Sequence, residues 1–266
     1  GASAKGSVLT ISAAGTYILS GTLTAGQVVV DAGKEDTVRL ILNGVSITCA
    51  NSAPLYAKKA AKTILTLADG TQNTLTDGAS YTFPDAETDE PSAAVFSKND
   101  LTINGGDIRI TSGDDGINTN EDGVSVTTIN GGTLTVNVTG GMAGEGDGID
   151  SNGWLVINGG TVGSVVNDTA AEITISGGTV TGQVANSGSG SISVTGGSFA
   201  TAELEDFIDP DRTIILTLEL GEGAAGAAAM AATSGAAVGT LPTPERSGTA
   251  CSNQSAPTGS CSRPRS

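Results

Sequence analysis

One short phrase recurs along the middle of the chain, with apolar residues at its first and third places and Gly-Gly at its fifth and sixth. In one copy, threonine takes the first place. The five copies are Leu101–Gly106, Thr127–Gly132, Leu155–Gly160, Ile173–Gly178 and Ile192–Gly197. Aligned on their glycine pairs, they follow one another at steps of 26, 28, 18 and 19 residues. A phrase that returns at such intervals is typical of a chain built from stacked structural repeats.

Each phrase leads into a second short segment in which apolar and polar residues alternate, as in 107–111 and 133–138. Alternation with a period of two is the pattern of a β-strand that turns one face to a core. The Asn-Gly and Gly-Gly steps favour tight corners, because glycine adopts positive φ without a steric penalty. Together these features predict an all-β, single-stranded parallel β-helix, right-handed overall. A β-sandwich is the main alternative, and the shorter steps would also suit a left-handed helix.

The pattern divides the chain into three parts. We expect residues 1–35 to form an N-terminal cap with the first strands, and residues 36–220 to form the parallel β-helix. From residue 221 to 266 the chain has no periodic apolar face, so that burial could not offset the entropy lost on ordering. We expect this tail to be disordered, either as a spacer or as the remnant of a truncated gene.

Charge and residue types exclude several classes of function. With 28 acidic and 12 basic residues, the net charge of −16 argues against a nucleic-acid partner. The chain has no histidine, which removes Ser-His-Asp and Cys-His catalysis and histidine-ligated metal centres. No apolar run approaches the roughly 20 residues of a membrane-spanning helix, so we expect no membrane insertion. The three cysteines lack the spacing of a metal site or a disulfide framework. We expect a monomer.

Two segments concentrate acidic residues at expected corners, and both contain Asp-Gly-Ile, at 115–117 and 147–149. Equivalent corners of neighbouring repeats stack about 4.8 Å apart, so Asp115 is expected beside Asp147. The other oxygen-bearing side chains expected close by are Asp114, Asn118, Asp150 and Asn152. Oxygen-rich clusters suit calcium, which takes about six to eight oxygen ligands. A plain Asp-Gly turn on a solvated acidic face is the alternative that needs no metal.

The sequence also resembles a known family. The segments that carry the resemblance are Gly15–Gly21, Gln27–Ala32, Val38–Ile47, Ala53–Tyr56, Leu65–Gly70, Asn73–Gly78, Ala94–Lys98 and Gly148–Gly153. They look like the bacterial carbohydrate-binding β-helix family, which is pectate-lyase-like and typified by a clostridial cellulose- and polygalacturonate-binding protein. This chain is similar to a truncated member. The resemblance implies a secreted or cell-surface protein that binds polysaccharide more than it catalyses. By position, it implies Asp114, Asp115 and Asp147 as calcium ligands.

Few side chains could bind plant cell-wall polysaccharide. Lys58, Lys59 and Lys62 could form a basic patch for acidic glycans, or else a solvated rim. Trp154, just after an expected corner, is the best exposed candidate for stacking on cellulose. Arg109 lies five residues before Asp114 and could reach a neighbouring corner, or remain on a strand surface.

We therefore predict an extracellular protein that binds cellulose or acidic pectin-type glycans, with calcium at its stacked corners. Two alternatives stay open: a structural stalk or adhesin segment of a surface protein, and a calcium-dependent polysaccharide lyase. The run Ser112-Gly-Asp-Asp-Gly116 resembles the paired aspartates of polygalacturonases, but their His-Gly and Arg-Ile-Lys motifs are absent here. We assign no catalytic residue.

Overall fold

The computed structural model describes residues 1–78, 80–84, 89–120, 124–139, 146–163, 165–167, 172–182, 184–186, 190–199, 214–218 and 228–232 of the chain. Every helix or strand element among these residues is a β-strand, so this part of the chain has no helix that could cross a membrane. The chain divides into two compact units, residues 1–234 and 235–266, and the second lies wholly outside the described residues. The tail expected over 221–266 is described only at β25 (Ala228–Ala232).

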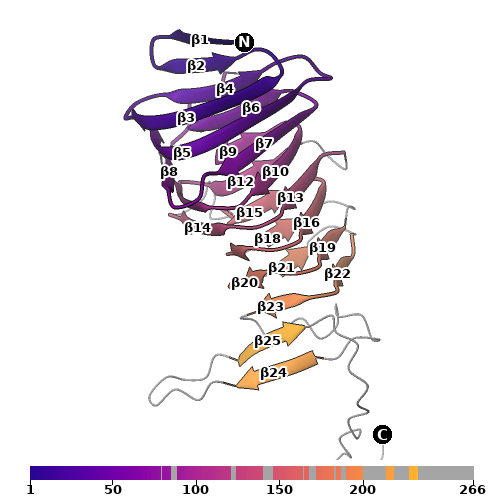
Figure 1. Ribbon diagram of the computed structural model, residues 1–266. Helices are drawn as coiled ribbons and strands as arrows, with labels where there is room; N and C mark the ends of the chain where they lie inside the picture. The colour runs from indigo at the N-terminus through magenta and orange to yellow at the C-terminus, as the bar shows by residue number, and fades with distance from the viewer. Residues whose placement is uncertain are drawn as a thin grey trace, which may run out of the picture. The chain divides into compact units, whose positions relative to one another are not determined.

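The described strands form two sheets (Figure 1). The first has nine strands, which pair in parallel except that β1 pairs antiparallel with β2 at one end. In spatial order they are β1 (Ala2–Lys5), β2 (Val8–Ile11), β4 (Gln27–Asp31), β6 (Leu55–Lys59), β9 (Ala93–Ser97), β12 (Asp115–Thr119), β15 (Ile149–Ser151), β18 (Val165–Asn167) and β21 (Val184–Asn186).

The second sheet has sixteen strands in two limbs that meet in one long strand, β5 (Thr37–Cys49), which also pairs with β3 (Gly15–Leu23). The first half of β5 pairs with the first limb and the second half pairs with the second limb. The first limb is β7 (Lys62–Leu67), β10 (Asp100–Asn104), β13 (Val126–Ile129), β16 (Trp154–Ile157), β19 (Ile173–Ile175) and β22 (Ile192–Val194). The second limb is β8 (Gln72–Asp77), β11 (Asp107–Ser112), β14 (Thr133–Val138), β17 (Thr161–Val162), β20 (Thr179–Val180) and β23 (Gly197–Phe199), followed by antiparallel β25 and β24 (Ile214–Leu218).

From β6 onward the chain follows one path again and again: a strand of the nine-stranded sheet, then one of the first limb, then one of the second limb. We call each such set of three strands a repeat. The repeats are β6-β7-β8, β9-β10-β11, β12-β13-β14, β15-β16-β17, β18-β19-β20 and β21-β22-β23. Strands of one repeat pair with the same strands of the next, as β9 with β12, β10 with β13 and β11 with β14. The predicted all-β class with stacked parallel strands is confirmed.

The register of the first limb matches the alignment of the glycine phrase. The residues at the first place of the phrase pair with one another in succession: Leu101 with Thr127, Thr127 with Leu155, Leu155 with Ile173, and Ile173 with Ile192. First and third places point to the same side of a strand, and almost all of them are fully buried. They belong to one continuous core that also takes in the inward residues of both other faces.

The fourth place of the phrase forms a ladder of side-chain hydrogen bonds along one corner. Asn130 Nδ2 donates to Asn104 Oδ1 at 2.9 Å, and Asn158 Nδ2 donates to Asn130 Oδ1 at 2.9 Å. Ser176 Oγ continues the ladder by donating to Asn158 Oδ1 at 2.9 Å. Amide side chains stacked one strand apart satisfy one another in this way, which explains why asparagine precedes the glycine pair.

The second glycine of the phrase makes a close approach to the backbone of the preceding repeat. Gly132 and Gly160 have φ of +93° and +87°, in the left-handed region that favours glycine. A Cβ on Gly132 would lie 2.5 Å from Gly105 O and 2.6 Å from Gly106 O. The next residue, Thr133, donates its backbone N–H to Gly106 O at 2.8 Å, which fixes the corner on the preceding repeat. Glycine is therefore required here by both conformation and contact.

Replacing Gly132 by alanine is expected to lower the free energy of unfolding by about 2 kcal/mol or more, because a left-handed residue would press its Cβ on two carbonyl oxygens. Gly131→Ala is the matched control, since its φ lies outside the left-handed region and its Cβ would come no closer than 3.8 Å to another atom. It should change stability by less than about 1 kcal/mol. Urea denaturation followed by circular dichroism measures both, and equal losses would contradict this account.

Candidate functional site

The corner between the nine-stranded sheet and the first limb is lined by lysines from successive repeats. A cavity of about 670 Å³ opens there, and we call it the lysine cleft. The side chains that line it are Lys34, Lys58, Lys59, Ala60, Lys98, Asn99, Asn120 and Val124. They lie at or after the ends of β4, β6, β9 and β12, so parallel stacking brings together residues that are far apart in the sequence.

The lysine cleft is a basic site in an acidic protein, because four of the chain's 12 basic residues line it. Lys58 Nζ forms an ion pair with Asp31 Oδ2 at 3.0 Å, and Lys98 pairs with Glu90. Within the described part of the chain, neither Lys34 nor Lys59 takes part in an ion pair. Ammonium groups gathered around one cavity repel one another and attract an anion into it.

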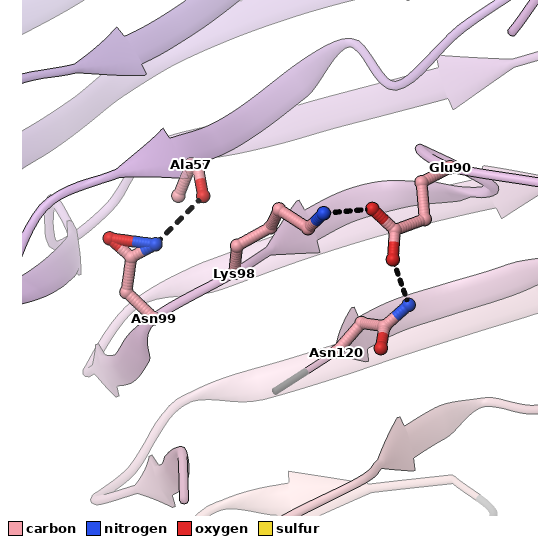
Figure 2. A network of polar contacts seen from close by, with 5 residues as sticks. All are labelled: Ala57, Glu90, Lys98, Asn99 and Asn120. Atoms are coloured by element: carbon pink, nitrogen blue, oxygen red, sulfur yellow. Dashed lines mark hydrogen bonds and ion pairs between the residues drawn. The ribbon is translucent and has the colours of Figure 1, made fainter. Parts of the chain in front are cut away.

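Two asparagines complete the polar lining (Figure 2). Asn99 Nδ2 donates to Ala57 O at 3.2 Å, while Asn99 Oδ1 is buried without a hydrogen-bond partner in the described structure. Asn120 Nδ2 donates to Glu90 Oε1 at 2.6 Å, and the same carboxylate pairs with Lys98. A buried acceptor without a partner is costly, so Asn99 Oδ1 is a strained polar position in the wall of the cleft.

The opposite corner, where the second limb leads into the nine-stranded sheet, gathers carboxylates, and we call it the acidic corner. Asp115 begins β12, and Asp147 precedes β15 in the next repeat. Asp147 N donates to Asp115 Oδ1 at 2.8 Å, and Gly116 N donates to Asp147 O at 2.8 Å. The two aspartates therefore lie on adjacent repeats, where the spacing of the Asp-Gly-Ile segments placed them.

Asn118 links Asp115 of one repeat with Asp150 of the next. Its Nδ2 donates to Asp115 Oδ2 at 2.9 Å and to Asp150 Oδ2 at 2.8 Å. Its Oδ1 is buried and has no hydrogen-bond partner among the described residues. Burial raises the pKa of Asp115 to about 7, and the charges of Asp114 and Asp147 act in the same direction. The corner thus holds the carboxylate of Asp115 in a setting that disfavours its ionisation unless a cation compensates it.

The donors of the acidic corner fit calcium by type but do not surround an ion by themselves. They are the carboxylates of Asp114, Asp115, Asp147 and Asp150 and the amide oxygen of Asn118. Asn152, predicted to join them, instead follows β15 at the opposite corner, where its backbone N–H donates to Thr119 O at 2.9 Å. Among the described residues, no three acidic side chains come together closely enough to form a metal-binding group. A calcium ion held here would therefore use one or two of these carboxylates with the buried Asn118 Oδ1, and complete its shell with backbone carbonyls and water.

The structure places the residues that were predicted to bind polysaccharide at different sites. Lys58 and Lys59 line the cleft. Arg109 is exposed on β11 between Thr74 and Thr135 of the neighbouring strands, and it is not part of the cleft lining. Trp154 is 42% exposed at the start of β16, and it does not line the cleft either.

Sequence analysis missed Lys98 and Asn120 as cleft residues, together with Lys34 and Asn99. One signal could have found Lys98: β6 and β9 pair from Leu55 with Val95 to Ala57 with Ser97, so Lys58 and Lys98 follow equivalent strand positions. The glycine phrase does not show this alignment, because it lies elsewhere in the repeat.

In the presence of EDTA, the free energy of unfolding is expected to fall as the pH rises from about 4 to about 7 and to level off above. The folded protein keeps a proton on Asp115 up to its raised pKa of about 7, whereas the unfolded chain loses it near the ordinary value of 3.8. Asp115→Asn should flatten this slope. Asp107→Asn, at an exposed position on β11, should retain it. Urea denaturation at a series of pH values measures these slopes. An unchanged slope in Asp115→Asn would contradict the raised pKa of Asp115.

Comparison with known proteins identifies a relationship over part of the chain. Residues 5–106 match a family described as carbohydrate-binding domain-containing protein. A protein of that description from Acetivibrio thermocellus is 47% identical over 91 residues, which are 34% of this chain and 32% of that protein. The match thus spans about a third of the relative's length.

A solved structure is similar over more of the chain. It is the polysaccharide lyase-like protein from C. thermocellum, in a gadolinium derivative, with a TM-score of 0.60 and 29% identity. The similarity covers 78% of this chain and 92% of that one. The predicted resemblance is confirmed: residues 5–106 match a carbohydrate-binding domain family, a relative of that description comes from a clostridial bacterium, and a structural neighbour is polysaccharide lyase-like.

Proposed function

We propose that the chain is an extracellular polysaccharide-binding protein built on a right-handed parallel β-helix. One observation carries this proposal: the segment that matches the carbohydrate-binding family, residues 5–106, contributes all four lysines of the lysine cleft. The repeated path of the strands supports the helix, because each circuit through the three faces pairs in parallel with the next.

An acidic, pectin-type glycan such as polygalacturonate fits the lysine cleft best. Its carboxylates would pair with the ammonium groups that are gathered in the cleft. Lys34 and Lys59, which have no ion pair in the described structure, are the first candidates for such contacts. Cellulose is the second candidate ligand, and the exposed ring of Trp154 favours it, because neutral sugars stack on aromatic faces.

We propose further that calcium binds at the acidic corner. One or two of the carboxylates of Asp114, Asp115 and Asp147 would hold the ion together with Asn118 Oδ1, with Asp150 beside it. No lysine or arginine occurs between Arg109 and Arg212, so the carboxylates of this region lack basic neighbours along the chain. Bound calcium would supply positive charge between adjacent repeats and relieve the repulsion of their carboxylates.

The two alternatives share this fold. A stalk or adhesin segment would need the acidic corner for stability and would bind no glycan. A calcium-dependent lyase would need a basic side chain beside the ion, and Arg109, the basic residue closest in sequence, lies exposed on the surface of β11. The binding proposal therefore rests on the lysine cleft, and no catalytic role is assigned.

Affinity electrophoresis through polygalacturonate tests the role of the cleft. The wild-type protein should be retarded, and Lys59→Met should weaken binding about fivefold, the size expected for one partly exposed ion pair. Lys5→Met removes the same charge from β1, outside the cleft lining, and should leave the retardation unchanged. Equal effects of the two variants would indicate general charge attraction, and no retardation of the wild type would refute the pectin proposal.

Thermal unfolding with added calcium or with EDTA tests the acidic corner. Calcium should raise the Tm of the wild-type protein, because an ion that binds the folded state stabilises it by mass action. Asp147→Ala should abolish most of that increase, while Asp107→Ala, at an exposed position on β11, should retain it. A protein that calcium stabilises but that binds neither polygalacturonate nor cellulose would support the stalk instead.

A further inference from the structure

Glu90 is held by two residues that line the lysine cleft, each from a different repeat (Figure 2). Its carboxylate forms an ion pair with Lys98, which follows β9, and accepts a hydrogen bond from Asn120 Nδ2 at 2.6 Å, after β12. The side chain of Glu90 is 17% exposed. An internal carboxylate is thus anchored to the wall of a basic cavity.

The donors around Glu90 have the chemistry of an anion subsite. An ammonium group and an amide N–H that reach one carboxylate from two sides supply charge and direction together. The ion pair of Lys58 with Asp31 differs, because no second donor reaches Asp31 Oδ2 among the described contacts and the side chains are 52% and 36% exposed. Of the two ion pairs described, the one with Glu90 is the better shielded.

We propose that Glu90 occupies, in the free protein, the position that a uronate carboxylate of the bound glycan takes. The proposal rests on the function proposed above and deepens it, because it makes Glu90 a specificity-determining residue. An incoming carboxylate can replace Glu90 bond for bond on Lys98 and Asn120. A neutral sugar cannot replace a charge, so displacement of Glu90 would leave Lys98 without its counterion.

This exchange favours long acidic chains over single sugars. Replacing the carboxylate of Glu90 by that of a single sugar gains little binding free energy, because the number of charge-assisted hydrogen bonds stays the same. A chain of uronates also reaches Lys59 and Lys34, which have no ion pair in the described structure and lie on the two preceding corners. Affinity for galacturonate oligomers should therefore rise steeply with their length.

Isothermal titration calorimetry with galacturonate, trigalacturonate and cellotriose tests the proposal. Glu90→Ala vacates the subsite, so it should bind trigalacturonate about tenfold more tightly than wild type and should bind single galacturonate measurably. Asp31→Ala is the matched control, because it removes the same charge from the other ion pair of the cleft lysines. Its gain should stay below about threefold. Neither variant should change the affinity for cellotriose.

Two further variants separate exchange from other effects. Glu90→Gln removes the charge but keeps the size of the side chain, so it reports on the subsite if Glu90→Ala fails to fold. In the Glu90→Ala background, Lys98→Met should abolish the gain, since Lys98 is the cation released by vacating the subsite. A gain that survives Lys98→Met, or equal gains in Glu90→Ala and Asp31→Ala, would overturn the proposal.

The outcomes also separate this proposal from the proposed function. If wild type binds polygalacturonate and the folded Glu90 variants show no gain, the subsite proposal fails and the binding function stands. If no variant binds a polysaccharide but Glu90→Ala binds galacturonate through Lys98, the binding function fails and the anion subsite stands. Loss of affinity in a folded Glu90→Ala protein would make Glu90 a positioning residue and overturn the exchange.

Discussion

The spacing between paired parallel strands is the constraint on which the rest of the structure depends. Each residue of a repeat lies about 4.8 Å from its counterpart in the next, so one residue type at one position becomes a continuous column. Isoleucine and leucine columns make the core, Asn104, Asn130 and Asn158 make a ladder, and the left-handed glycines let the corners stack. Residues that depart from these columns gather on the surface at the corners.

The strands of the nine-stranded sheet also set the distance between the two polar corners. All of them from β2 onward run in the same direction, so their starts share one edge and their ends share the other. Strand β12 begins with Asp115 at the acidic corner and ends just before Asn120 in the lysine cleft. Four steps of about 3.3 Å separate its first and last residues, so sites of opposite charge lie roughly 13 Å apart along one strand.

The sequence determines the repeats more readily than the cleft. The glycine pairs alone predict that Leu101 pairs with Thr127, and the Asp-Gly-Ile segments alone place Asp115 beside Asp147. The glycine phrase could not reveal the lysine cleft, because Lys34, Lys98 and Asn120 lie outside it, even though Lys98 follows a strand position equivalent to that of Lys58. Glu90 was equally hidden, since its partners are set by the stacking of β9 on β12. The recurring sequence motifs identify the stacked repeats, whereas the residues of the lysine cleft lie outside those motifs.

The unequal repeat lengths have an evolutionary consequence. The 18-residue step from Leu155 to Ile173 shows how little sequence one full circuit requires. The step of 28 residues adds its extra length mainly in the connection 139–148, before the acidic corner, whereas the step of 26 residues adds it mainly in the longer strands β11 and β12. An insertion in such a connection leaves the strand register intact. Duplication of the short circuit can therefore lengthen the protein, while insertion at a corner diversifies what it recognises, and each change can be selected without the other.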